Sequence, residues 1–450
     1  MKIVITGAGK VGEELCKSLS EENNDIVLIE KDPRRLDQLI SAADITGIAG
    51  NGVLYDTQLE AGVDSCDVFI AVSLHDESNI IGAITAKKIG AKYTIARVRD
   101  PEFSSQINFV RESLGITLLI NPELVAASEI AEIIEFPSAL GIERFDNGRV
   151  KIVEVKIAED SPLAGKTVKQ LREEYPDIIV CVINSGGNIC IPNGDTAIQT
   201  GDHIHITGLL KDIDRFYVNA KSFKKRLHSA LIVGGGRITH YLLPRLTALK
   251  MRLKVVEKDP EMADSIAAEF PDVDVVLGDG TEQAFLKEEG LGNYDALIAL
   301  TGVDEENLLL SIFAAQQGVK KTICKVNRVD LLDVIKHEDI DSVITPSRLI
   351  ADSIIRFVRA RKSAKGSDVD ALYRLENNRV EALQFHVLNE SKVKDIPLQE
   401  LKLLNNLIVA FIIRNGKAIF PSGTDAIANN DRVIVVTTHH NLRDIDDILA

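Results

Sequence analysis

The chain has 450 residues, of which 45% are hydrophobic, and a formal net charge of −15. At about 150 residues per domain, this length predicts more than one domain. The negative charge disfavours nucleic acid as a main partner, because a phosphate backbone needs a basic footprint, and it disfavours non-specific binding to an anionic membrane surface.

Short apolar runs alternate with helical patterns over residues 2–120. Continuous apolar strands separated by helices predict a parallel sheet with helices on both faces. Asn121-Pro122 then predicts a further helix, because Asn is a good N-cap and Pro is favoured in the first turn, and Thr345-Pro346 repeats this arrangement. In the first domain we expect strands at 2–6, 25–30, 45–49, 68–73 and 93–98, and helices at 11–19, 34–41, 54–61 and 79–89.

The pattern changes to short strands and tight turns from about residue 140 to residue 218. Asn147-Gly148 and Gly186-Gly187 are hairpin signals, because these residues tolerate the positive φ angles of two-residue turns. We therefore expect a small α+β domain in this region.

The same succession occurs a second time, about 227 residues later. Gly7-Ala-Gly9-Lys-Val-Gly12 is matched by Gly234-Gly-Gly236-Arg-Ile-Thr239, and each of the following strands ends in Glu-Lys-Asp-Pro. The small domain has its copy as well, since Ile191-Pro-Asn-Gly194 is matched by Phe420-Pro-Ser-Gly423. The sequence thus predicts an α/β protein with two tandem Rossmann-like, doubly wound parallel-sheet domains, each followed by a small α+β domain. We expect these four domains at 1–134, 135–218, 228–360 and 361–450, with a linker at 219–227.

The first glycine-rich turn is typical of a dinucleotide-binding site. Gly7 permits the tight turn, Gly9 lets the backbone approach a pyrophosphate, and Gly12 lets helix and strand pack closely. The helix start presents free N–H groups to the phosphates. Glu30 ends the next strand, near the offset at which a carboxylate accepts the ribose hydroxyls. An acid there favours a free 2′-hydroxyl, as in NAD or adenosine nucleotides, over a 2′-phosphate.

The second turn departs from this pattern at one glycine. Thr239 stands where the third glycine is expected, so we expect the helix to lie farther from its strand. Such a site would bind a different nucleotide, or the same one more weakly, with Glu257 in the acid position. Lys10 and Arg237 hold matching turn positions, where a cation either contacts phosphate or is solvated at the helix start.

Further matched residues follow the strands at the edge where a parallel sheet binds its ligands. Arg97 and Lys325 are cations at matched strand ends, within reach of ribose or phosphate. Asp76 and Asp304 either belong to the same crevice or cap the helices that begin there. The other matched candidates are Asn51 with Asp279, Ser73 with Thr301, and Leu74 with Gly302.

The doubled turn, the doubled Glu-Lys-Asp-Pro segment and the doubled small domain resemble the TrkA family. These are cytosolic regulatory subunits of Trk-type potassium uptake systems, built from two tandem RCK (KTN) domains. The resemblance implies a homotetrameric ring on the inner face of the membrane beneath a TrkH-type potassium channel. It also implies that NAD(H), ATP or ADP gates the pore by changing the ring's shape, and that the helices after Asn121 and Thr345 pair neighbouring units. The implied cofactor-binding residues are Gly7, Ala8, Gly9, Lys10, Val11, Glu30, Asn51, Ser73, Leu74 and Arg97 in the first site, and Gly234, Gly235, Gly236, Arg237, Ile238, Glu257, Asp279, Thr301 and Lys325 in the second.

Two other function classes deserve comparison. NAD-dependent oxidoreductases are the proteins in which such a turn is most often found, but an enzyme of this class needs a proton donor or acceptor beside the nicotinamide. None of the nine histidines recurs at a matched position, so we expect no catalytic residues. A metal-sensing module would use His203-Ile-His205, whose rings share one strand face, or His439-His440; we expect solvated histidines and no metal site. The five cysteines lack a Cys-x-x-Cys spacing, and we expect buried thiols in a reducing cytosol.

Overall fold

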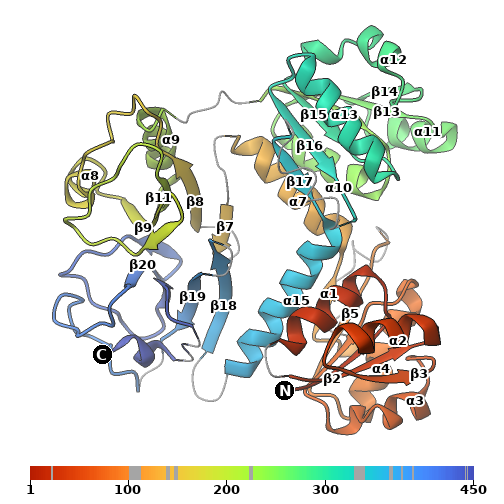
Figure 1. Cartoon of the computed structure of the whole chain (residues 1–450), viewed down its shortest axis with the longest axis horizontal. Coiled ribbons are helices and arrows are strands. Elements are labelled where there is room, and N and C mark those ends of the chain that lie inside the picture. The colour runs from red at the N-terminus through yellow and green to blue at the C-terminus, as the bar shows by residue number, and fades with distance from the viewer. Residues whose placement is uncertain are drawn as a thin grey trace. The chain divides into compact units, whose positions relative to one another are not determined.

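The structure is a computed structural model of the chain (Figure 1). Its residues form two compact units, one of residues 1–135 with 226–355 and one of residues 136–225 with 356–450. The first unit holds the two Rossmann-like domains and the second holds the two small domains. The structure describes residues 1–21, 24–100, 113–137, 142–145, 150–221, 227–328, 340–363, 368–376, 379–387, 390–440, 442 and 444–450.

The first Rossmann-like domain is a parallel sheet in the order β3-β2-β1-β4-β5-β6. β1 is central, because Thr6 pairs with Ile29 of β2 on one side and with Ala71 of β4 on the other. The strand order reverses direction between β1 and β4, which is where open α/β sheets bind ligands. The elements predicted for residues 2–98 are all present, with small differences at their ends. The strands are β1 (Lys2–Thr6), β2 (Asp25–Glu30), β3 (Thr46–Ala49), β4 (Val68–Ala71), β5 (Tyr93–Arg97) and β6 (Leu118–Ile120), and the helices are α1 (Lys10–Ser20), α2 (Pro33–Ala42), α3 (Tyr55–Glu60), α4 (Asp76–Ile89) and α7 (Pro122–Glu135).

The second Rossmann-like domain repeats this topology, with the order β14-β13-β12-β15-β16-β17. Its central strands are almost fully buried, as expected for a sheet covered on both faces. The strands are β12 (Ser229–Val233), β13 (Arg252–Glu257), β14 (Asp274–Leu277), β15 (Ala296–Ala299), β16 (Lys321–Lys325) and β17 (Ser342–Ile344), and the helices are α10 (Arg237–Ala248), α11 (Pro260–Glu269), α12 (Gln283–Glu288), α13 (Asp304–Gln316) and α15 (Pro346–Ser363).

Both Glu-Lys-Asp-Pro segments end a strand and begin a helix at once. Asp32 accepts a hydrogen bond from Arg34 N at the start of α2, and Asp259 accepts one from Met262 N at the start of α11. Asp is preferred at the N-cap and Pro at the first helical position, so the segment turns the chain in the fewest residues. The preceding glutamate is therefore the last residue of its strand, at the carboxyl end of the sheet.

Helix α7 follows the first sheet in sequence but packs on the second Rossmann-like domain. Ala127 and Ile130 share a buried cluster with Leu242 of α10 and with strand residues of the second sheet. Asn121 caps α7 as predicted, since its side chain accepts a hydrogen bond from the first-turn backbone, and it also donates to the Tyr241 hydroxyl at 2.9 Å. The two Rossmann-like domains are therefore joined by a shared core.

The two small domains pack sheet against sheet inside the second unit. One sheet has the order β10-β9-β11-β8-β7 and the other β18-β19-β22-β20-β21. Phe145 of the first contacts Phe411 of the second edge-on, with ring centroids 5.5 Å apart, in a cluster that both sheets share. The opposite face of each sheet has its own apolar cluster. The elements are β7 (Ile142–Phe145), β8 (Val150–Lys156), α8 (Val168–Glu174), β9 (Ile178–Ser185), β10 (Asn188–Cys190), β11 (His203–Gly208), α9 (Leu210–Asn219), β18 (Asp368–Leu375), β19 (Val380–His386), β20 (Leu407–Arg414), β21 (Lys417–Ile419) and β22 (Arg432–Thr437).

One of the two hairpin turns predicted for the first small domain lies within the described residues, and it forms as predicted. Gly186 and Gly187 have φ values of 57° and 98° and connect β9 to β10, so this predicted hairpin is confirmed. The hairpin predicted at Asn147-Gly148 lies outside the described residues, as does most of the predicted linker at 219–227.

Two expectations about reactive side chains are wrong. His205 was expected on a solvated strand face, but it is 6% exposed because Glu376 of the second small domain lies against it. Cys190 was expected to be buried, but it is exposed because it lies on β10 at the edge of its sheet. The other four cysteines are buried free thiols.

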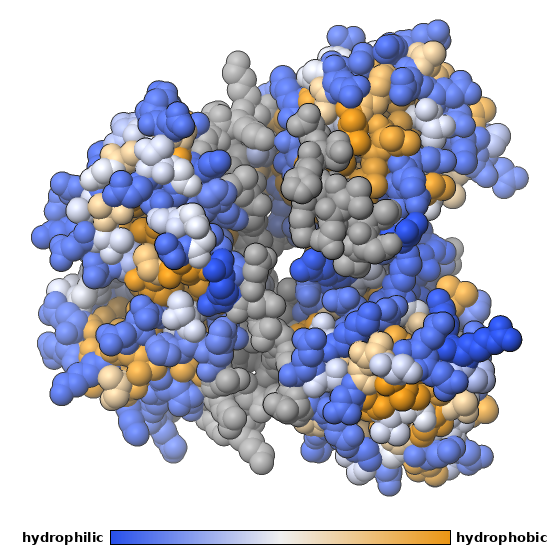
Figure 2. Space-filling view, in the orientation of Figure 1, coloured by the Kyte–Doolittle hydropathy of each residue, from blue (hydrophilic) through white to orange (hydrophobic). Residues whose placement is uncertain are grey.

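The face of the molecule seen in Figure 2 is largely polar where it is coloured. Figure 2 shows hydrophilic residues interspersed with smaller hydrophobic areas over the visible coloured surface. Exposed large apolar residues such as Leu74 and Leu309 occur, which is normal when they are scattered singly. Among the residues that the structure describes, no helix has the length and apolarity that crossing a bilayer requires.

Candidate nucleotide-binding site

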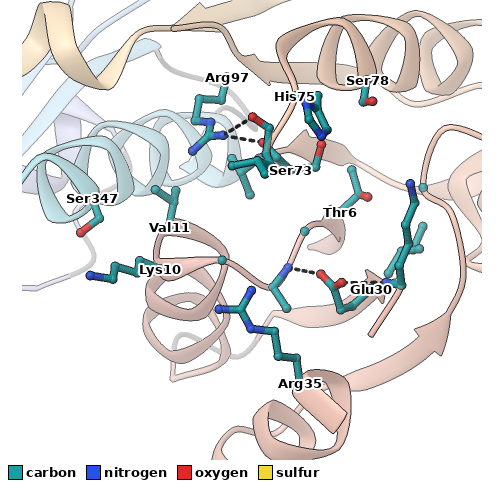
Figure 3. Close-up of a pocket in the computed structure, with 18 of the residues that line it drawn as sticks. Thr6, Lys10, Val11, Glu30, Arg35, Ser73, His75, Ser78, Arg97 and Ser347 are labelled. Carbon is teal, nitrogen blue, oxygen red and sulfur yellow. Dashed lines mark hydrogen bonds between the residues drawn. The ribbon is translucent and has the colours of Figure 1, made fainter. Parts of the chain in front are cut away.

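A cavity of about 640 Å³ lies at the carboxyl ends of β1, β2, β4 and β5 (Figure 3). Its size is within the usual range for small-molecule and cofactor sites. Figure 3 shows Arg97 and Ser73 across the cavity from Glu30 and Arg35. The structure brings together every residue predicted for the first site: Gly7, Ala8, Gly9, Lys10, Val11, Glu30, Asn51, Ser73, Leu74 and Arg97.

The three turn glycines have different steric surroundings. Gly7 has φ 105°, and a Cβ there would lie 2.8 Å from the backbone of Ser73. A Cβ on Gly12 would lie 1.9 Å from the carbonyl oxygen of Gly7, so only glycine lets α1 pack this closely. A Cβ on Gly9 would meet nothing within 4 Å. Gly9 is thus open toward the cavity, where a pyrophosphate would approach the backbone.

Glu30 holds the turn in place. Its Oε2 accepts a hydrogen bond from Ala8 N at 2.6 Å, and its Oε1 accepts from Lys31 N at 2.8 Å and from Asp32 N at 3.0 Å. Each carboxylate oxygen offers two acceptor sites, so Oε2 retains one for a ribose hydroxyl. Glu30 therefore has a structural role that the sequence did not predict, beside the ligand role that it did.

Arg97 forms the opposite side of the cavity. Its Nη2 donates to the carbonyl oxygens of Ser73 at 2.5 Å and of Leu74 at 3.3 Å. Burial lowers the pKa of Arg97 from its ordinary value, but an arginine side chain keeps its charge in proteins. The guanidinium is thus a fixed positive group at the edge where anionic ligand groups would lie.

Asn79 lies behind the cavity wall and connects two strand ends by hydrogen bonds. Its Oδ1 accepts from the amide and hydroxyl of Ser73, and its Nδ2 donates to the carbonyl oxygens of Ser73 and Arg97, all at 2.7–3.0 Å. Asn307 makes the matching contacts with Thr301 and Lys325 in the second domain. Both asparagines are fully buried, so they are supports rather than ligand contacts.

We expect Asn79→Ala to lower the free energy of unfolding by about 3 kcal/mol, because it leaves several buried polar groups without partners. Calorimetric or urea unfolding of the full chain measures this effect. Ser78→Ala is the matched control, since Ser78 lies one residue earlier on the same helix and lines the cavity. Equal stability of the two variants would contradict the proposed role of Asn79.

The suggestion that Asp76 and Asp304 cap their helices is wrong. The carboxylate of Asp76 accepts hydrogen bonds from Arg99 N at 2.7 Å and Asp100 N at 2.9 Å, and Asp304 makes the equivalent contacts in the second domain. Each aspartate is the first residue of its helix and not the N-cap. The two carboxylates instead hold the segment that follows the neighbouring strand.

Several cavity residues could not be found from the motif. Arg99 and Glu123 form an ion pair, with Nε and Oε1 2.7 Å apart, and Glu123 lies in the first turn of α7. Asn327 and Ser347 come from the second Rossmann-like domain, with Ser347 in the first turn of α15. Arg35 follows the Glu-Lys-Asp-Pro segment, but the second copy has no cation at that place, so comparing the copies did not single it out. Arg99, Glu123, Asn327 and Ser347 reach the cavity only through tertiary packing, which the motif does not describe.

The second glycine-rich turn has nearly the same backbone as the first. Gly234 has φ 103°, against 105° for Gly7. Gly236 is the N-cap of α10, with φ −71° and ψ −173°, and Gly9 is the N-cap of α1, with φ −70° and ψ −178°. The two turns therefore present their backbone N–H groups in the same way.

Thr239 changes the packing behind the second turn. It is fully buried, and its hydroxyl donates a hydrogen bond to Gly234 O at 2.5 Å. Since a Cβ at Gly12 would lie 1.9 Å from the matching oxygen, threonine would not fit the spacing of the first domain, and a larger spacing between helix and strand is therefore still expected in the second.

The other residues predicted for the second site lie around this turn and at the neighbouring strand ends. Glu257 accepts a hydrogen bond from Gly235 N, the contact that Glu30 makes in the first domain. Asp279 accepts from the hydroxyl and the amide of Thr281, which lowers the pKa of Asp279. Burial lowers the pKa of Lys325. The remaining members of the set are Arg237, Ile238 and Thr301.

Sequence comparison identifies the family. The TrkA-N domain matches residues 3–122 and 230–346, and the TrkA-C domain matches residues 152–220 and 383–450. The chain belongs to the TrkA family. A Trk system potassium uptake protein TrkA homolog of Archaeoglobus fulgidus is 30% identical over 449 residues, covering 100% of both chains. The Trk system potassium uptake protein TrkA of Halomonas elongata is 30% identical over 451 residues, covering 99% of this chain and 98% of its own. These matches confirm the resemblance to TrkA proteins seen in the sequence.

Solved structures show the same fold as this TrkA family member. The GsuK RCK domain superposes with a TM-score of 0.62 at 15% identity, covering 97% of this chain and 92% of its own. The GsuK channel bound to NAD gives a TM-score of 0.63 at 16% identity, covering 99% of this chain and 78% of its own. The tandem Rossmann-like and small domains predicted from the sequence are therefore an RCK-type fold.

Proposed function

We propose that this TrkA family member is a cytoplasmic, nucleotide-sensing regulatory subunit that gates potassium uptake through a TrkH-type channel. The cavity of the first Rossmann-like domain carries the proposal. It combines an open Gly9, the acceptor Glu30 and the fixed cation Arg97 in a protein whose full-length relatives are named potassium uptake proteins. Its ligand is NAD(H), with ATP or ADP as alternatives.

The make-up of the cavity supports a coupling between ligand and conformation. A ligand on the turn of the first domain also reaches Asn327 and Ser347 of the second domain. It reaches the Arg99–Glu123 pair as well, and Glu123 lies in the first turn of α7, whose apolar residues pack on that second domain. A nucleotide that contacts both domains binds one of their arrangements better than another, and only such differential affinity shifts a conformational equilibrium.

Assembly provides the link to the membrane. We propose a homotetrameric ring, attached to the inner face of the membrane through its channel partner, in which both glycine-rich turns of each chain bind nucleotide. The negative charge of the chain suits contact with a protein partner better than direct contact with anionic lipid. Two solved relatives of the fold are described as bound to NAD and to ADP, which makes these ligands the first to test.

The test is potassium flux in proteoliposomes that contain the cognate channel, with and without this protein. We expect at least one of ATP, ADP and NADH to change flux in the presence of the protein by about 5- to 150-fold, the usual range of allosteric coupling. Flux that is indifferent to all three would contradict the proposal. NADH absorbance is followed in parallel with candidate small substrates, and steady consumption would favour an oxidoreductase instead.

A further inference from the structure

Three metal-ligating side chains meet inside the unit formed by the two small domains. Glu154 of β8 and His205 of β11 face each other directly across the antiparallel ladder, so their side chains share one face of the first sheet. Glu376, which follows β18, reaches the same place from the second small domain. One ligand atom from each of the three lies within 4.8 Å of the others.

The cluster is enclosed. The side chains of His205 and Glu376 are 7% and 9% exposed, and that of Glu154 is 22% exposed. His205 Nε2 lies 2.8 Å from Glu376 Oε1. Two carboxylates and an imidazole in such a place are costly to bury together unless a positive charge compensates them.

Neighbouring polar groups orient both carboxylates. Asn184 Nδ2 donates to Glu376 Oε2 at 2.6 Å, which leaves Oε1 turned toward His205. His203 Nδ1 lies 2.7 Å from Glu154 Oε1. Metal sites depend on such outer partners, which fix the rotamers of the ligands.

The duplication gives an internal comparison. Glu154 and His205 are paired across two neighbouring strands. The corresponding pair in the second small domain is Gln384 and Ile434. The fold therefore forms without an acid and an imidazole at these positions. The ligand set is a property of the first copy and not a requirement of the sheet.

We propose that Glu154, His205 and Glu376 bind a divalent first-row transition-metal cation such as Zn²⁺, which links the two small domains. One imidazole with two carboxylates suits zinc-class cations, whereas Mg²⁺ and Ca²⁺ take oxygen ligands. Zinc lies about 2.0–2.2 Å from such ligands, so small side-chain rotations would bring the three atoms into its shell. The inference does not depend on nucleotide binding by the other unit.

The test uses the metal-stripped full chain and titrates it with ZnCl₂ by calorimetry. We expect one cation per chain at this site, and an affinity on the order of 100-fold weaker in His205→Gln, since even outer partners cost about 10- to 100-fold. Co²⁺ in place of zinc should give the visible absorption of a protein-bound ion. Zinc should also raise the unfolding temperature of the wild type, because a ligand that binds only the folded state stabilises it.

His440→Gln is the matched control, because His440 Nδ1 lies 3.2 Å from Glu381 in the second small domain, so this variant also removes a histidine that contacts a glutamate. It should bind zinc like the wild type. Glu154→Gln, at the more exposed ligand, covers the case in which His205→Gln fails to fold. No zinc binding by the wild type, or wild-type affinity in folded Glu154→Gln, would overturn the proposal and leave a structural ion pair.

Discussion

Gly9→Ala is expected to remove nucleotide binding at the first site while leaving the fold intact. Gly9 has φ −70° and ψ −178°, which alanine adopts without strain, and a Cβ there meets no atom within 4 Å. The methyl group instead occupies the path by which a pyrophosphate reaches the backbone. Losing charge-assisted hydrogen bonds of about 1.5–3 kcal/mol weakens binding by about 10- to 150-fold. The unfolding free energy should fall by no more than about 1 kcal/mol, the usual cost of alanine at an N-cap.

Gly12→Ala provides the contrast. Its Cβ would lie 1.9 Å from Gly7 O, so α1 must move and the free energy of unfolding should fall by about 1–3 kcal/mol or more. Calorimetric titration with ATP, ADP and NADH, together with urea unfolding, separates the two variants. Gly236→Ala repeats the Gly9 change in the second domain and isolates the second site. Wild-type nucleotide affinity in Gly9→Ala would show that the first turn does not bind phosphate.

Substitution of the turn glutamates should have the next largest effect. We expect Glu30→Ala and Glu257→Ala each to weaken nucleotide binding at their own site by about 1–3 kcal/mol, through lost ribose contacts. The structure adds a second contribution, because Glu30 also accepts the hydrogen bond from Ala8 N and Glu257 that from Gly235 N. Both variants should therefore also lose some stability.

A 2′-deoxynucleotide separates the two roles of Glu30. If Glu30 contacts the 2′-hydroxyl, the wild type should prefer the ribonucleotide, and Glu30→Gln should lose most of that preference. If Glu30 has only a structural role, Glu30→Gln would weaken the binding of both nucleotides equally. The ratio of the two affinities would then be the same as in the wild type. This comparison works as a double-mutant cycle between the side chain and the hydroxyl.

The sequence predicted the elements that local chemistry determines. Alternating apolar strands and helices, the glycine turn and the Asn121-Pro122 helix start are local patterns, and the structure has each of them where expected. The residues predicted for the first site also line one cavity, because the carboxyl ends of parallel strands meet at the same end of a sheet wherever the helices lie. What these residues bind remains a prediction.

The residues that sequence reasoning missed depend on contacts between distant segments. Glu123 enters the cavity because α7 carries it there, and Ser347 because the second domain packs beside the first. Asp76 looked like a cap, since an acid in the first turn of a helix is consistent with either role. The contact between His205 and Glu376 joins residues 171 positions apart and needed the pairing of the two small sheets. No period or spacing in the sequence encodes that pairing.

The most direct test of the central claim is nucleotide-dependent potassium flux with a subunit whose first site alone is disabled. Proteoliposomes with the cognate channel receive either the wild type or Gly9→Ala, and cosedimentation confirms that each associates with the channel. The account predicts that nucleotide changes flux with the wild type and that Gly9→Ala associates normally but loses most of this response. An undiminished response in Gly9→Ala at the same nucleotide concentration would contradict control by the first cavity.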